Sequence, residues 1–150
     1  MGAARGKKNS LLDGYCFEGF RPQVGKERGI FGKPRAAIIP LARRSKKTHC
    51  GECGAVHRGW HQSEPKLIRD LSCGEMQIYL EIEFRHVFCE KCGKVTSEGL
   101  EWLAEDALHT KRFANYIAER CRYGAVESVA ADLDLDRNTV NRMKKKYTPK

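Results

Sequence analysis

His49-Cys50-Gly51-Glu52-Cys53-Gly54 and Cys89-Glu90-Lys91-Cys92-Gly93 are the two stretches that decide how this 150-residue chain is organised. Each contains two cysteines that are separated by two residues and followed by glycine. Such a turn brings both sulfurs onto one ion, and the glycine supplies the positive φ that the turn commonly needs. Two such turns offer four thiolates at tetrahedral geometry, with no open position for water or substrate. The spacing therefore predicts a structural Zn²⁺ site whose ligands are Cys50, Cys53, Cys89 and Cys92.

Other interpretations of these cysteines are disulfides, unpaired core thiols or a redox pair. No secretory leader is visible, and seven cysteines are an odd number, so a complete disulfide framework is disfavoured. A nearby side chain could replace one cysteine ligand, and the candidates are His49, His57, His61, His86 and Cys73. We expect His86 to be a packed, hydrogen-bonded residue of a strand and Cys73 to lie at a turn away from the metal.

The 35 residues between the two cysteine pairs must fold back on themselves. From Met76 to Arg85, apolar and polar residues alternate, which is the pattern of a half-buried strand. A shorter apolar run at Lys66–Leu71 precedes it, and Ser72-Cys73-Gly74 is typical of a turn. A hairpin with a cysteine pair at each end is a zinc ribbon, which we assign to residues 48–95.

The net charge of +9 is unevenly distributed along the chain. Residues 1–47 carry 12 Lys and Arg against 3 Asp and Glu, residues 48–109 carry 6 against 11, and residues 110–150 carry 10 against 5. Basic ends around an acidic centre indicate that the ends contact a polyanion. Since no apolar run is long enough to cross a bilayer, we expect no membrane partner and a cytoplasmic, nucleoid-associated protein.

The basic N-terminal segment, residues 1–47, is predicted to be partly disordered and largely irregular. Residues 1–10 are small and polar, and glycines and prolines interrupt the apolar residues of 11–41 too often for a long helix. Residues 36–41 are compatible with a strand, which Pro40 would limit to the edge of a sheet. The sequence does not indicate a role for residues 11–41.

A helical region is predicted after the ribbon. Apolar residues at helical spacing in 96–109 suggest a short connector helix that packs on the ribbon. Residues 110–150 then form a separate domain. Its first helix begins after the N-cap Thr110 and ends at Gly124, with Cys121 on the buried side.

Residues 126–147 have the features of a helix-turn-helix. Ala130 is small enough to let the second helix cross closely, Leu135 fills the angle of the turn, and Val140 faces back towards the core. Asp136 is a strong N-cap for the second helix. Asp134 stands where glycine is common, and aspartate tolerates the left-handed conformation better than most residues.

The second of these helices carries polar and basic residues on its outer side. Arginine and asparagine make bidentate contacts with guanine and adenine edges in the major groove, and lysines contact phosphates. The predicted contacts with double-stranded DNA are Arg137, Asn138, Asn141, Arg142, Lys144, Lys145 and Lys146. The alternative is a three-helix unit whose basic face is merely solvated.

The combined pattern resembles the N-terminal region of bacterial insertion-sequence transposases of the ISL3 family. It consists of the four-cysteine ribbon, Arg69-Asp70-Leu71 before the hairpin turn, Phe88-Cys89 at the end of the long strand, and the helix-turn-helix. The resemblance covers residues 48–148. It implies an α+β chain of small modules, in which the ribbon and the helix-turn-helix recognise the terminal inverted repeats of the element.

In that family a following RNase H-like domain uses three carboxylates and two divalent metals to cut and join DNA. The acidic residues here are expected to be mostly surface charges, so we assign no catalytic residues and interpret the chain as truncated before that domain and not an enzyme. The alternatives are a transcriptional regulator built from the same modules and a zinc-ribbon protein-interaction module. Self-association, or association with an intact transposase, is a further possibility for its partners.

Overall fold

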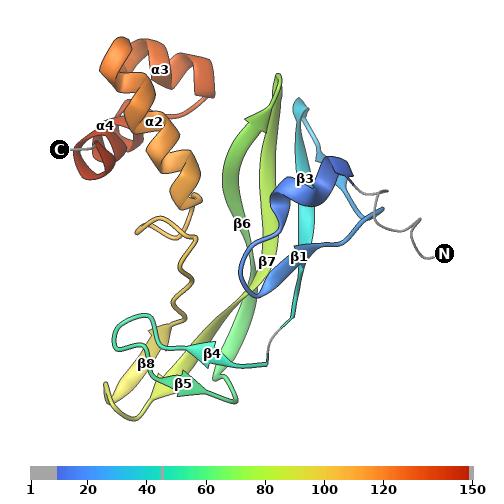
Figure 1. Cartoon of the computed structure of the whole chain (residues 1–150), viewed down its shortest axis with the longest axis vertical. Coiled ribbons are helices and arrows are strands. Elements are labelled where there is room, and N and C mark those ends of the chain that lie inside the picture. The colour runs from blue at the N-terminus through green and yellow to red at the C-terminus, as the bar shows by residue number, and fades with distance from the viewer. Residues whose placement is uncertain (1–9, 45, 149–150) are drawn as a thin grey trace.

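The computed structural model describes residues 10–44 and 46–148 and shows an α+β chain (Figure 1). The disorder expected for residues 1–10 falls almost entirely outside the described residues. The elements follow one another as η1 (Ser10–Tyr15), β1 (Phe20–Pro22), β2 (Arg28–Ile30), β3 (Lys33–Arg43), β4 (Thr48–His49), β5 (Val56–His57), β6 (Gln62–Cys73), β7 (Met76–Cys89), β8 (Lys94–Ser97), α2 (Lys111–Tyr123), α3 (Val126–Leu133) and α4 (Arg137–Tyr147). The predicted order of zinc ribbon and helix-turn-helix is confirmed.

The long β6–β7 hairpin forms the central part of the sheet, because β7 pairs with β3, β6 and β8. The two strands are antiparallel, with Ile68 opposite Leu80, and Gly74 makes the turn at φ +62°. The expected alternation is observed from Ile78 to Phe84, where the even-numbered residues are buried, whereas Met76 is exposed and Arg85 is buried. Strand β8 pairs with the far end of β7, so this end of the hairpin carries the second cysteine pair.

The N-terminal segment is not largely irregular, which corrects our expectation. Strand β3 lies parallel to β7, with Ile39 opposite Leu80, and β1 and β2 pair with the other side of β3. The glycines that suggested irregular structure occupy turns instead, with Gly25 at φ +85° and Gly32 at φ +83°. Alternating apolar residues of β3 complete the core of the sheet.

Pro40 does not place β3 at an edge, which was also predicted incorrectly. The Pro40 carbonyl accepts a hydrogen bond from the Gln23 N–H at 2.8 Å, on the side of β1. Since the nitrogen and the carbonyl of one strand residue point to the same side, the missing N–H also points there. It faces the end of β1, where the Gln23 carbonyl accepts from Lys26 N–H, so the ladder with β7 on the other side of β3 is unaffected.

The predicted connector helix over 96–109 is wrong. Strand β8 ends at Ser97, and the following residues form turns and isolated bridges. The backbone here forms turns of its own, such as the one closed by Ala107 N–H and Ala104 O at 2.9 Å, and it also bonds to strand β6. Arg69 N–H donates to Leu108 O at 2.9 Å, and Thr110 N–H donates to Arg69 O at 3.0 Å. Ala107 has φ +57°, which is incompatible with a right-handed helix. The apolar residues of this segment, which are spaced as in a helix, belong to two different cores. Leu103 packs in the core of the sheet, and Ala104 packs in the core of the helical domain.

The helical domain has the predicted geometry. The Thr110 hydroxyl accepts from Phe113 N–H, and Asp136 Oδ1 accepts from Thr139 N–H at 2.7 Å, so both N-caps are confirmed. Asp134 ends α3 in the left-handed conformation, at φ 58° and ψ 51°. Cys121, Ala130, Val140 and Met143 are buried in one core. No helix in the described parts of the chain is long and apolar enough to cross a membrane.

The Arg69-Asp70-Leu71 segment of β6 joins this domain to the sheet. Asp70 is fully buried and accepts hydrogen bonds from the Thr110 hydroxyl at 2.7 Å and from Arg112 Nε at 2.9 Å and Nη2 at 2.5 Å. Arg69 Nη2 donates to the Leu133 carbonyl at the end of α3, at 2.7 Å. This satisfies a carbonyl that the helix leaves unpaired and places a cation at its C-terminus.

Replacing Asp70 by alanine is expected to lower the free energy of unfolding by about 3 kcal/mol, because Arg112 and Thr110 lose a buried carboxylate. Urea unfolding followed by circular dichroism measures this. The control is Glu81→Ala, which removes the more exposed Arg28–Glu81 pair and should cost less than about 1 kcal/mol. Equal losses of unfolding free energy in the two variants would contradict a special role for the contact between Asp70 and the helical domain.

Candidate metal centre and nucleic-acid interface

The structure brings the four cysteines of the two C-x2-C-G motifs together. Their Sγ atoms all lie within 4.8 Å of one another, with Cys50 3.8 Å from Cys92 and Cys53 3.5 Å from Cys89. Cys50 follows β4, and Cys89 is the last residue of β7. The cluster therefore connects the small β4–β5 sheet to the end of the long hairpin.

Each cysteine pair lies on a tight turn that its glycine closes. Gly54 N–H donates to Cys50 O at 2.9 Å and Gly93 N–H donates to Cys89 O at 2.7 Å, with φ +80° and +74° at the two glycines. The Glu52 N–H also lies 3.4 Å from Cys50 Sγ, in hydrogen-bonding geometry. Backbone donors aimed at sulfur stabilise thiolates, which are the form that binds a metal.

The sulfur positions fit a tetrahedral metal ion. Four thiolates about 2.3 Å from one Zn²⁺ lie roughly 3.8 Å apart, whereas a disulfide requires about 2.05 Å. No histidine joins this group among the described residues, and Cys73 is at the opposite end of the hairpin. His86 Nε2 lies 3.4 Å from Glu64 Oε2, and its Nδ1 lies 3.4 Å from Ser97 Oγ, in keeping with a hydrogen-bonded strand residue.

The protonation of these thiols is uneven. The hydrogen bond between Thr96 Oγ1 and Cys50 Sγ, at 3.0 Å, is the main cause that lowers the pKa of Cys50 to about 6. Burial, followed by hydrogen bonds to the other sulfurs, raises the pKa of Cys92 to about 12. Burial is thus the main obstacle to ionising Cys92, the neighbouring sulfurs add to it, and a bound cation would oppose both effects.

A buried ion pair supports the first cysteine turn. Glu98 accepts from Arg43 Nη1 at 3.1 Å and Nη2 at 2.6 Å, and from the Arg85 backbone N–H at 2.7 Å. Next to it, Gly51 N–H donates to Ser97 O at 2.8 Å and Gly99 N–H donates to His49 O at 2.9 Å. Most acidic side chains among the described residues are exposed, as expected, and Glu98 and Asp70 are the buried exceptions.

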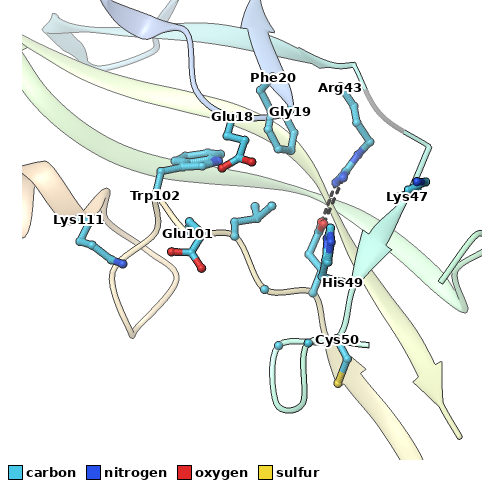
Figure 2. Close-up of a pocket in the computed structure, with 15 residues that line it drawn as sticks. Glu18, Gly19, Phe20, Arg43, Lys47, His49, Cys50, Glu101, Trp102 and Lys111 are labelled. Atoms are coloured by element: carbon cyan, nitrogen blue, oxygen red, sulfur yellow. Dashed lines mark hydrogen bonds and ion pairs between the residues drawn. The ribbon is translucent and has the colours of Figure 1, made fainter. Parts of the chain in front are cut away.

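A cavity of about 740 Å³ lies between β1, the first cysteine turn and the linker after β8 (Figure 2). Trp102 lines it beside Glu18, and the Arg43–Glu98 pair forms another part of its wall. Its charged side chains have both signs, for example Glu101 and Lys111. No single recognition chemistry follows from this lining.

Helix α4 exposes all seven predicted DNA contacts, and the structure adds ion pairs that the sequence did not show. Arg142 Nη2 lies 3.2 Å from Asp106 Oδ2, and Lys146 Nζ lies 2.6 Å from Glu105 Oε2. Arg137 pairs with Glu127 across the helix-turn-helix at 3.0 Å. Among the described residues, no acidic side chain pairs with Lys144 or Lys145. The sequence analysis did not predict that Glu105 and Asp106 pair with α4. Their only signal in the sequence is that two acidic residues are adjacent, in a segment that was expected to form a connector helix.

Comparison with known proteins follows the same division of the chain. Residues 46–92 match the zinc-finger of transposase IS204/IS1001/IS1096/IS1165, and residues 98–148 match the helix-turn-helix domain of transposase family ISL3. Both modules of the chain are therefore similar to domains of ISL3-family transposases. A curated relative from Bordetella parapertussis, the transposase for insertion sequence element IS1001, is 29% identical over 121 residues.

That match spans 81% of this chain and 28% of the relative's length. The segments that are similar to ISL3 domains are thus the zinc ribbon and the helix-turn-helix, in the order that the structure displays. These matches support a DNA-binding region of the kind that ISL3-type transposases carry. No solved structure matches the chain significantly.

In the zinc-ribbon module, Gly51 should not tolerate a side chain. A Cβ at Gly51 would lie 2.6 Å from the Ser97 carbonyl oxygen, which is itself bonded to Gly51 N–H. We expect Gly51→Ala to cost about 2 kcal/mol of stability through this backbone clash. Chemical denaturation measures it. Gly59→Ala, where no atom lies within 4 Å, is the control and should change stability by less than about 0.5 kcal/mol.

Proposed function

We propose that this chain recognises the terminal inverted repeats of an insertion element, as the DNA-reading part of an ISL3-type transposase. The observation that carries the proposal is helix α4: it is fixed in a complete helix-turn-helix by Val140 and Met143, while its opposite side is exposed and basic. In a helix-turn-helix this second helix enters the major groove.

The exposed residues of α4 suit two tasks. Asn138, Asn141 and Arg142 carry the amide and guanidinium groups that read base edges. Lys144 and Lys145 follow in the last turn, where cations also complement the helix dipole and can contact phosphates. Arg137 and Lys146 complete the proposed DNA contacts at the two ends of the helix.

We further propose that Cys50, Cys53, Cys89 and Cys92 hold one structural Zn²⁺. The ion would supply a cross-link between the β4–β5 sheet and the β7–β8 hairpin. The ribbon around the cluster has a very small apolar core, in which Val87 is the largest buried side chain. Such a module depends on its metal for folding. The four thiolates leave no open position for a reacting group, so the site is structural.

Selection from a random duplex library tests the DNA proposal. The chain should retain sequences with a defined motif, and this motif should occur in the inverted repeats of an insertion element in the source genome. Retention of no motif, with binding that vanishes as salt rises, would contradict specific recognition. A motif found only at promoters would favour a transcriptional regulator instead.

Substitution of two exposed residues that lie one turn apart on α4 can distinguish base reading from phosphate contact. Asn141→Ala should cost about 1–3 kcal/mol on the selected site and relax the preference at one base pair. Lys145→Ala should weaken binding to all sequences about equally and reduce the salt slope by about 1. Fluorescence anisotropy with matched duplexes measures both, and equal, sequence-independent losses would remove the base-reading role of Asn141.

Zinc removal should unfold the ribbon. We expect about one zinc ion per chain, and a chelator should abolish the near-ultraviolet circular dichroism of Trp60. The indole ring of Trp60 stacks on Arg85, which in turn donates to the Thr48 hydroxyl beside the first cysteine turn. Cys53→Ser should lower the zinc content, whereas the control Cys73→Ser should not. An unchanged spectrum after complete metal removal would contradict the structural role.

A further inference from the structure

Asp106 is held rigidly in the linker between the sheet and the helical domain. Its Oδ1 accepts from Leu108 N–H at 2.9 Å, and its Oδ2 lies 2.8 Å from His109 Nδ1. Burial raises the pKa of Asp106, but these bonds and the one to Arg142 outweigh it and lower the pKa to about 2. The carboxylate is therefore ionised at neutral pH, and its position is set before any ligand arrives.

The partner of Asp106 on α4 is Arg142, whose Nη2 donates to Oδ2 at 3.2 Å. Arg142 follows Asn138 by four residues and Asn141 by one, so the three side chains share the outer side of the helix. The Arg142 side chain remains 53% exposed. Its planar fork carries five N–H donors, of which the bond to Asp106 uses one nitrogen, Nη2.

The pairing suits a base contact better than a phosphate contact. An arginine beside an ionised carboxylate has little net charge to offer a phosphate, and the carboxylate repels the phosphate as well. Its directional donors are unaffected, and a guanine edge presents two acceptors without a full charge. Restricting the rotamers of Arg142 before binding also reduces the entropy lost when the contact forms.

We infer that Asp106 is a positioning residue for DNA specificity: it orients Arg142 for a bidentate contact with the major-groove edge of one guanine. This inference rests on the proposed function. It assigns a reading role to a linker residue outside the helix-turn-helix. The neighbouring pair, Glu105 with Lys146, lies one turn further along α4 and provides an internal comparison, because lysine is a point charge without a planar fork.

The test measures binding of the full chain to its selected duplex and to variants at each base pair. Arg142→Ala should lower discrimination at one G·C pair by roughly 5- to 150-fold. Asp106→Asn should lower discrimination at that same pair by about two- to tenfold, and should have no further effect there in the Arg142→Ala background. Glu105→Gln is the control and should change affinity for all duplexes alike.

Circular dichroism of each variant at the assay temperature confirms that it is folded, and Asp106→Asn retains an oxygen that can accept from Leu108 N–H. If Asp106→Asn weakens all duplexes equally, or leaves the Arg142-dependent base pair unchanged, the positioning role is wrong while sequence-specific binding by the unmodified chain still stands. If the unmodified chain shows no sequence preference, it is the proposed function that fails.

Discussion

The fully buried carboxylate of Asp70 is the constraint on which the arrangement of this molecule depends. It belongs to the central hairpin, yet its bonding partners, Thr110 and Arg112, begin the helical domain. A buried charge is tolerable when its hydrogen-bonding capacity is filled, so the first turn of α2 must stay against β6. Arg112 also donates to the Gly14 carbonyl, which fastens the N-terminal segment to the same point. Three parts of the chain that are distant in sequence thus meet at one ion pair.

The opposite end of the hairpin is organised by similar means. The ribbon has too little apolar material for a core of its own, and polar cross-links replace it: the cysteine cluster and the buried Arg43–Glu98 pair. Arg43 ends β3, so this pair connects the N-terminal strands to the cysteine turns. The cysteine cluster and the helix-turn-helix are therefore not joined only by flexible linkers. They are fixed at the two ends of one sheet (Figure 1).

This architecture bears directly on the proposed DNA recognition. The linker that replaces the expected connector helix bonds to β6 and then presents Glu105 and Asp106 to α4. The face of α4 is consequently shaped by residues outside the helix-turn-helix, and its charge is lower than the sequence of the helix suggests. In this arrangement Lys144 and Lys145 would provide nonspecific attraction, while side chains nearer the start of α4 would provide sequence preference.

Features that depend on short-range chemistry could be predicted from the sequence. The spacing of the cysteines, the alternation after Met76, and the caps Thr110 and Asp136 each act within a few residues, so the pattern of residue types is sufficient. The tertiary structure decided what depends on distant partners. Parallel pairing of β3 with β7 placed Pro40 inside a sheet, and residues 96–109 formed turns and bonds to β6 where a helix was expected. Backbone and side-chain groups bond to whichever partner folding brings near, and helical spacing alone cannot reveal which partner that is.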